Sequence, residues 1–73
     1  MARYKRLDTL TTMKQIGLIP VFYNPDAETA KQIACACADG GARVIEFTNR
    51  GDRAVDVFKQ LAIFRDTERP DII

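Results

Sequence analysis

The stretch ARVIEFTNRGD, residues 42–52, decides how the chain is interpreted. Residues 42–49 of this stretch are expected to form a buried β-strand around the apolar run 44–47, yet Glu46 stands in the middle of it. Burial of an unpaired carboxylate costs several kcal/mol. A buried strand of this sequence therefore needs a structural or functional reason for Glu46.

Side chains alternate along a strand, and this alternation assigns Glu46 to one face. Val44, Glu46 and Thr48 are expected on the same face. Ile45 and Phe47 are expected on the other, and this large apolar pair suits the face that packs against helices. Glu46 then points to the opposite side, which in a (β/α) barrel is the interior. The carboxyl end of a barrel strand is where catalytic groups lie.

Helical and strand-like segments alternate through the rest of the chain. Apolar residues recur at steps of three in residues 3–16, which indicates an amphipathic helix that ends at Gly17. Residues 18–23 form an apolar run and are expected to be a buried strand, although Pro20 cannot donate to a ladder. Asn24 is expected to cap a second, alanine-rich helix that ends at a Gly-Gly pair.

A third helix and the beginning of a further strand follow. Residues 53–65 carry apolar side chains on one helical face, and residues 70–73 are expected to begin a third strand. Helices that alternate with near-continuous apolar strands are typical of parallel βαβ units. Two strands and the beginning of a third cannot complete a sheet, so we expect the chain to be part of a larger α/β fold.

Composition and charge exclude several classes of protein. The 73 residues have a net charge of +1, and acidic and basic residues are mixed along the chain. The sequence therefore shows no basic cluster of the kind that binds nucleic acid or a membrane surface. The absence of histidine removes imidazole bases and most zinc sites. Cys35 and Cys37 are two apart in a helical segment and point away from each other, so neither a disulfide nor a metal site is expected. Without a signal peptide or an apolar span, we expect a cytoplasmic protein.

Glu46 and Arg50 together suggest a substrate site. A partly desolvated carboxylate can move protons during a reaction. Arg50 follows four residues later, where the strand gives way to its loop, and a guanidinium can bind a substrate carboxylate through a bidentate fork. From the residues alone two alternatives stay open: a substrate site, or side chains that only neutralise each other or face solvent.

Three motifs in residues 17–52 resemble those of a known family. Ile19-Pro20-Val21 matches an apolar-Pro-Val first strand, and Gly40-Gly41 matches the end of an alanine-rich helix. The segment from Glu46 to Arg50 matches a second strand of the pattern Glu-apolar-Thr-x-Arg. In these motifs and their order the chain resembles the 2-keto-3-deoxy-6-phosphogluconate aldolases, also called 4-hydroxy-2-oxoglutarate aldolases.

The resemblance implies that residues 1–73 are a single partial domain, the N-terminal third of a homotrimeric (β/α)8 TIM barrel. It also implies a class I aldolase of carbohydrate metabolism that uses neither metal nor cofactor. In that family a lysine forms a Schiff base with the 2-keto acid, and cleavage gives pyruvate and glyceraldehyde 3-phosphate. Glu46 resembles the general acid/base, Arg50 the residue that binds the pyruvate carboxylate, and Thr48 a supporting substrate-binding residue.

The lysines depart from the family pattern. The four of them, Lys5, Lys14, Lys31 and Lys59, fall in expected helices, whereas the family's Schiff-base lysine lies on a later strand. A barrel of this type needs about 200 residues or more. We therefore expect the 73-residue chain alone to be inactive. The alternatives are a free-standing βαβ module that binds an anion or partner through the Arg50 loop, and an aldolase-like fold reused for assembly.

Overall fold

The computed structural model describes residues 4–73, which form three helices and two short parallel strands. The helices have 11, 13 and 15 residues, whereas each strand has only two. In chain order the elements are α1 (Arg6–Ile16), β1 (Val21–Phe22), α2 (Ala27–Asp39), β2 (Glu46–Phe47) and α3 (Ala54–Glu68).

This architecture shows that the expected fold is wrong. The sequence predicted long strands at residues 18–23 and 42–49 and the onset of a third strand at 70–73, as in the N-terminal third of a TIM barrel. The described residues instead form a mostly helical globule with a radius of gyration of 11.6 Å, and residues 70–73 form no strand. Among residues 4–73 each strand has only one full-length neighbour, and Pro20 cannot donate to a ladder, so regular pairing is confined to two residues.

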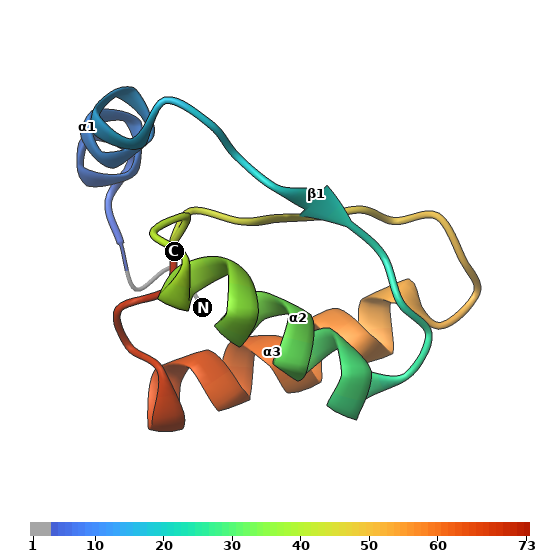
Figure 1. Ribbon diagram of the computed structural model, residues 1–73. Helices are drawn as coiled ribbons and strands as arrows, with labels where there is room; N and C mark the ends of the chain where they lie inside the picture. Colours follow the sequence, from blue (N-terminus) through green and yellow to red (C-terminus); the bar gives the residue numbers. More distant parts are fainter. Residues whose placement is uncertain (1–3) are drawn as a thin grey trace.

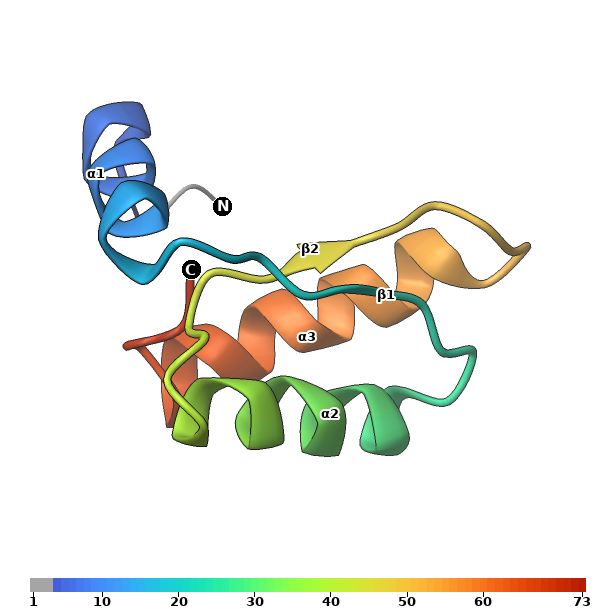
Figure 2. The same cartoon turned by 45° about the horizontal axis from the view of Figure 1, so that its top comes forward.

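Helices lie on both sides of the small sheet (Figures 1 and 2). α2 and α3 lie side by side against one face of β1 and β2. α1 lies on the other side of the sheet, near the start of both strands. The carboxyl ends of the strands are therefore at the opposite end of the sheet from α1.

Small side chains allow α2 and α3 to approach each other closely. Ala30 of α2 is fully buried, and Ala54 and Val57 of α3 are each 2% exposed. The sheet adds larger side chains to this core, because the Phe22 and Phe47 rings meet edge to face with centroids 5.4 Å apart. The core thus consists of an alanine-rich helix pair beneath a small aromatic cluster.

The register of the sheet confirms which face of β2 meets the helices. Val21 pairs with Glu46, and Phe22 pairs with Phe47. Phe47 stacks on Phe58 of α3, with centroids 6.3 Å apart. Ile45, also on the helical side, lines a hollow with residues of α2 and α3.

The helix ends follow local rules, with one exception. Gly17 ends α1 in the left-handed conformation, with φ of 83°, and its N–H donates to Met13. The predicted beginning of this helix at residue 3 lies outside the described residues, and α1 begins at Arg6. Asp26 caps α2 in place of Asn24, which was the predicted cap.

The Asp26 carboxylate accepts two hydrogen bonds from Thr29, one from its N–H at 3.0 Å and one from its hydroxyl at 2.6 Å. Asn24 instead accepts from the N–H of Asp26 at 2.9 Å, which forms a turn ahead of the helix. These bonds lower the pKa of Asp26, because the Thr29 hydroxyl and then its N–H stabilise the ionised carboxylate.

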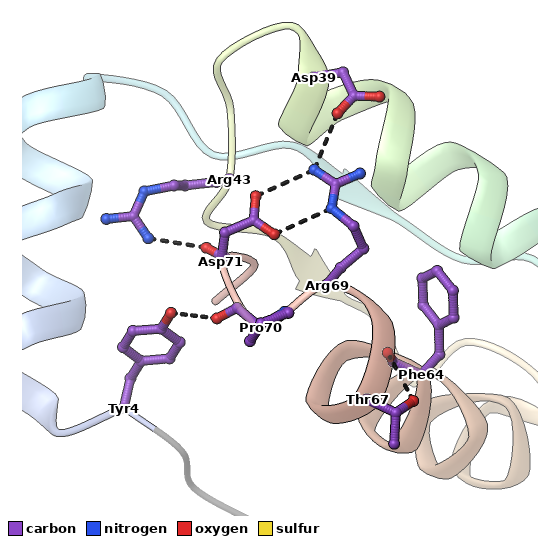
Figure 3. A network of polar contacts seen from close by, with 8 residues as sticks. All are labelled: Tyr4, Asp39, Arg43, Phe64, Thr67, Arg69, Pro70 and Asp71. Carbon is purple, nitrogen blue, oxygen red and sulfur yellow. Dashed lines mark hydrogen bonds and ion pairs between the residues drawn. The ribbon is translucent and has the colours of Figure 1, made fainter.

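A polar network fixes the turn that follows α3 (Figure 3). The Arg69 guanidinium bonds to both carboxylate oxygens of Asp71 at 3.1 Å and to Asp39 at the end of α2 at 3.0 Å. Arg43 donates to the Asp71 carbonyl at 2.9 Å, and the Tyr4 hydroxyl donates to the Pro70 carbonyl. The hydrogen bonds from Arg69 lower the pKa of Asp71.

Candidate functional site

Phe47 packs on α3, so alternation along the strand puts the neighbouring Glu46 on the face turned away from α2 and α3, as predicted, but Glu46 is exposed. Its partner across the ladder, Val21, is 49% exposed. Val44, two residues earlier on the same face, is only 5% exposed. The desolvated setting that the sequence predicted for Glu46 is therefore not formed by residues 4–73.

Thr48 connects the two strands beyond β2. Its N–H donates to the Phe22 carbonyl at 3.0 Å, and its hydroxyl lies 3.4 Å from the same oxygen. Alternation places Thr48 on the Glu46 face. Because its hydroxyl is already directed at the backbone, Thr48 is better suited to holding the strand ends together than to binding a substrate directly.

Arg50 is exposed in the loop between β2 and α3, which leaves the carboxyl end of the sheet. Within residues 4–73 neither Arg50 nor Glu46 forms an ion pair or a side-chain hydrogen bond. The alternative in which the two side chains only neutralise each other is thus not what the structure shows. Both side chains remain available to a ligand, Glu46 on β2 and Arg50 in the loop that follows it.

Tyr23 supports this loop, and sequence reasoning did not identify it. Its ring centroid lies 5.7 Å from that of Phe47. Its hydroxyl lies so close to Gly51 that a Cβ atom on Gly51 would be 2.5 Å from the oxygen. The Tyr23 ring, which follows β1, thus packs directly against Gly51, the residue after Arg50. A glycine in the turn after the strand is the one sequence signal that could have suggested such a close approach.

The four lysines lie on or next to helices. Lys5 precedes α1 and Lys14 lies in its last turn. Lys31 on α2 pairs with Glu28 at 3.0 Å and lies 5.6 Å from the centroid of the Phe64 ring. Lys59 is exposed on α3. None of the four therefore belongs to the strands that form the sheet.

The described residues offer no cluster for a metal ion, since nowhere in residues 4–73 do three His, Cys, Asp or Glu side chains gather. Cys35 and Cys37 are both free thiols, half-buried on α2. In the same part of the chain, no helix combines the length and the apolar character needed to cross a membrane.

Comparison with known proteins finds no family model that matches the chain and no curated protein whose sequence matches it. The resemblance to the aldolases therefore rests on the three motifs within residues 17–52.

Proposed function

We propose that Glu46 and Arg50 are the proton-transfer group and the carboxylate-binding group of a pyruvate-forming class I aldolase. The observation that supports this proposal is that both side chains are exposed and without a side-chain partner among residues 4–73, with Glu46 on β2 and Arg50 in the loop that follows it. An arginine that is to bind a substrate carboxylate must not already be paired with a carboxylate of the protein.

The proposed substrate is 2-keto-3-deoxy-6-phosphogluconate. A lysine amine would condense with its keto carbon and release water. The C–C bond would then break, leaving its electron pair in an enamine and releasing glyceraldehyde 3-phosphate. Protonation of the enamine and hydrolysis of the resulting imine would give pyruvate and the free lysine. Glu46 would carry protons in these steps, and Arg50 would hold the carboxylate so that the keto carbon is oriented.

The Schiff-base lysine of this proposal is expected outside these 73 residues, because none of the four lysines lies on a strand. The chain alone is therefore expected to bind a 2-keto acid weakly and not to cleave one. Homotrimeric assembly and a cytoplasmic location are parts of the same proposal, and two free thiols suit a reducing compartment.

A titration with pyruvate tests the role of Arg50. We expect the backbone amide resonances of residues 48–51 to shift in the wild-type chain and in the matched variant Arg53→Gln, which removes another exposed arginine nearby. The same shifts should be absent in Arg50→Gln. Acetone, a ketone without a carboxylate, should also produce none. Equal shifts in Arg50→Gln and wild type would contradict the carboxylate-binding role.

Trapping with borohydride tests the lysine assignment. After incubation with pyruvate and borohydride, the intact mass of the chain should show no reduced adduct. An adduct on Lys5, Lys14, Lys31 or Lys59 would show that the Schiff base can form within the 73 residues and would contradict the assignment.

The alternative function is a non-catalytic binding or assembly module. It is favoured by the large apolar side chains that remain about half exposed or more, namely Leu7, Leu10, Leu18, Val21, Val55, Phe58 and Ile63. If pyruvate shifts no resonance while sedimentation shows that the chain self-associates, this alternative replaces the aldolase proposal.

A further inference from the structure

Tyr23 joins the two loops that leave the carboxyl end of the sheet. The strands are parallel, so the segments that follow β1 and β2 begin at the same end (Figure 2). Tyr23 comes directly after β1, and Arg50 and Gly51 lie in the loop after β2. The N–H of Thr48 donates to the Phe22 carbonyl at 3.0 Å, which holds the beginnings of the two loops together.

Two contacts fix the position of the Tyr23 ring. Its centroid lies 5.7 Å from that of Phe47, with the two rings tilted by 48°. At the other end of the ring, a Cβ atom on Gly51 would lie 2.5 Å from the hydroxyl oxygen and 2.7 Å from the carbon that bears it. The hydroxyl end of the ring therefore occupies space that any other residue type at position 51 would fill. This packing holds the phenol oxygen against the residue that follows Arg50.

The hydroxyl held in this position has no protein partner. Tyr23 is half-buried, and among residues 4–73 its hydroxyl forms no hydrogen bond. The other tyrosine of the chain, Tyr4, donates its hydroxyl to the Pro70 carbonyl. A packed tyrosine usually finds a partner for its hydroxyl. Tyr23 thus adds an unused donor to the loop that carries Arg50, whose guanidinium also has no acceptor within residues 4–73.

We propose that Tyr23 is a second substrate-binding residue, whose hydroxyl donates a hydrogen bond to the 2-keto acid carboxylate that Arg50 binds. This role rests on the proposed function, because the ligand is the same. The two oxygens of a carboxylate offer about four lone-pair sites. A bidentate guanidinium uses two of them, so a phenol can donate to a third. The second donor restricts the tilt of the carboxylate on Arg50 and so helps to orient the keto carbon.

Tyr23→Phe tests the proposal, because it keeps the ring and removes only the hydroxyl. In a titration of the 73-residue chain with pyruvate, followed at the amide resonances of residues 48–51, this variant should bind about tenfold more weakly than wild type. Tyr4→Phe is the matched control and should bind as wild type does, because its hydroxyl is bonded elsewhere. Wild-type affinity in Tyr23→Phe, with binding abolished in Arg50→Gln, would overturn the role of Tyr23 and leave the proposed function standing. Absence of pyruvate binding by the wild-type chain would overturn both.

Gly51→Ala separates the effect of the hydroxyl from that of the loop. The added Cβ atom must displace the hydroxyl end of the Tyr23 ring, so pyruvate binding should weaken severalfold although Tyr23 and Arg50 are both present. In the Tyr23→Phe background the same substitution should cause a much smaller further loss, because no hydroxyl is left to displace. An equal loss in both backgrounds would show that Gly51→Ala acts on the loop alone and would overturn the proposal.

Discussion

Replacement of Gly51 by alanine tests how the loop that carries Arg50 is held. A Cβ atom at this position would lie 2.5 Å from the Tyr23 hydroxyl oxygen and 2.7 Å from the ring carbon that bears it. Both distances are shorter than a van der Waals contact, so the ring of Tyr23 must move. That ring also lies against Phe47, which limits how far it can shift without loss of packing.

Two opposing effects determine the size of the change. Overpacking of this kind costs about 1 to 3 kcal/mol. Gly→Ala also restricts the unfolded chain and stabilises by about 0.4 to 1 kcal/mol where the backbone suits alanine. Gly51 is not among the glycines with positive φ, so this gain applies. We therefore expect Gly51→Ala to lower the free energy of unfolding by about 1 kcal/mol.

The sign should reverse when Tyr23 is removed. In a Tyr23→Ala background the Cβ atom meets no ring, so Gly51→Ala should stabilise the chain by roughly 0.5 kcal/mol. Urea unfolding of the four members of this double-mutant cycle measures both values. With an m value of about 1 kcal/mol per molar urea, the single variant should unfold at about 1 M less urea. The same loss of stability in both backgrounds would refute the proposed contact between Tyr23 and Gly51.

Three further outcomes are expected. Asp26→Ala removes both bonds to Thr29 and should lower the free energy of unfolding by about 1 kcal/mol in urea, whereas Asp26→Asn should lose less; equal losses would contradict the capping role. Because Arg69 lowers the pKa of Asp71 in the folded chain, the stability from this carboxylate is present above its unfolded pKa and is lost as pH falls through the lowered folded value. Unfolding measured from about pH 5 to pH 2 should therefore be less pH-dependent in Asp71→Asn, and an unchanged slope would exclude this linkage. In the complete enzyme of the proposed function, Glu46→Gln should reduce aldol cleavage by roughly 100- to 10,000-fold with an unchanged thermal midpoint, and full activity would rule out Glu46 as the acid/base.

Features governed by neighbouring residues could be predicted from the sequence. The glycine at position 17 ends α1, as its conformational freedom allows. Alternation along β2 correctly placed Phe47 against the helices and Glu46 on the other face. The sequence predicted Asn24 as the cap of α2, whereas the structure has Asp26 in this role. Both residue types are good caps, and the conformation of the turn ahead of the helix decides which side-chain oxygen accepts from the Thr29 N–H.

Features that depend on distant segments could not be predicted in this way. The apolar runs around β1 and β2 have the composition of long strands, yet ladder pairing extends over only two residues because each strand has a single full neighbour. The exposure of Glu46 could not be predicted either, since it depends on whether another segment covers this side chain, and no described segment does. Local composition cannot specify how many partners a strand finds.

The sequence by itself determined where the helices lie and which residues share a face of β2, because both follow from backbone geometry and side-chain spacing over a few positions. The tertiary structure alone decided that Arg50 and Glu46 have no side-chain partner within residues 4–73, and that Tyr23 rests on Gly51. These properties arise from contacts between segments far apart in the chain, and such contacts are settled only when the helices and strands pack together.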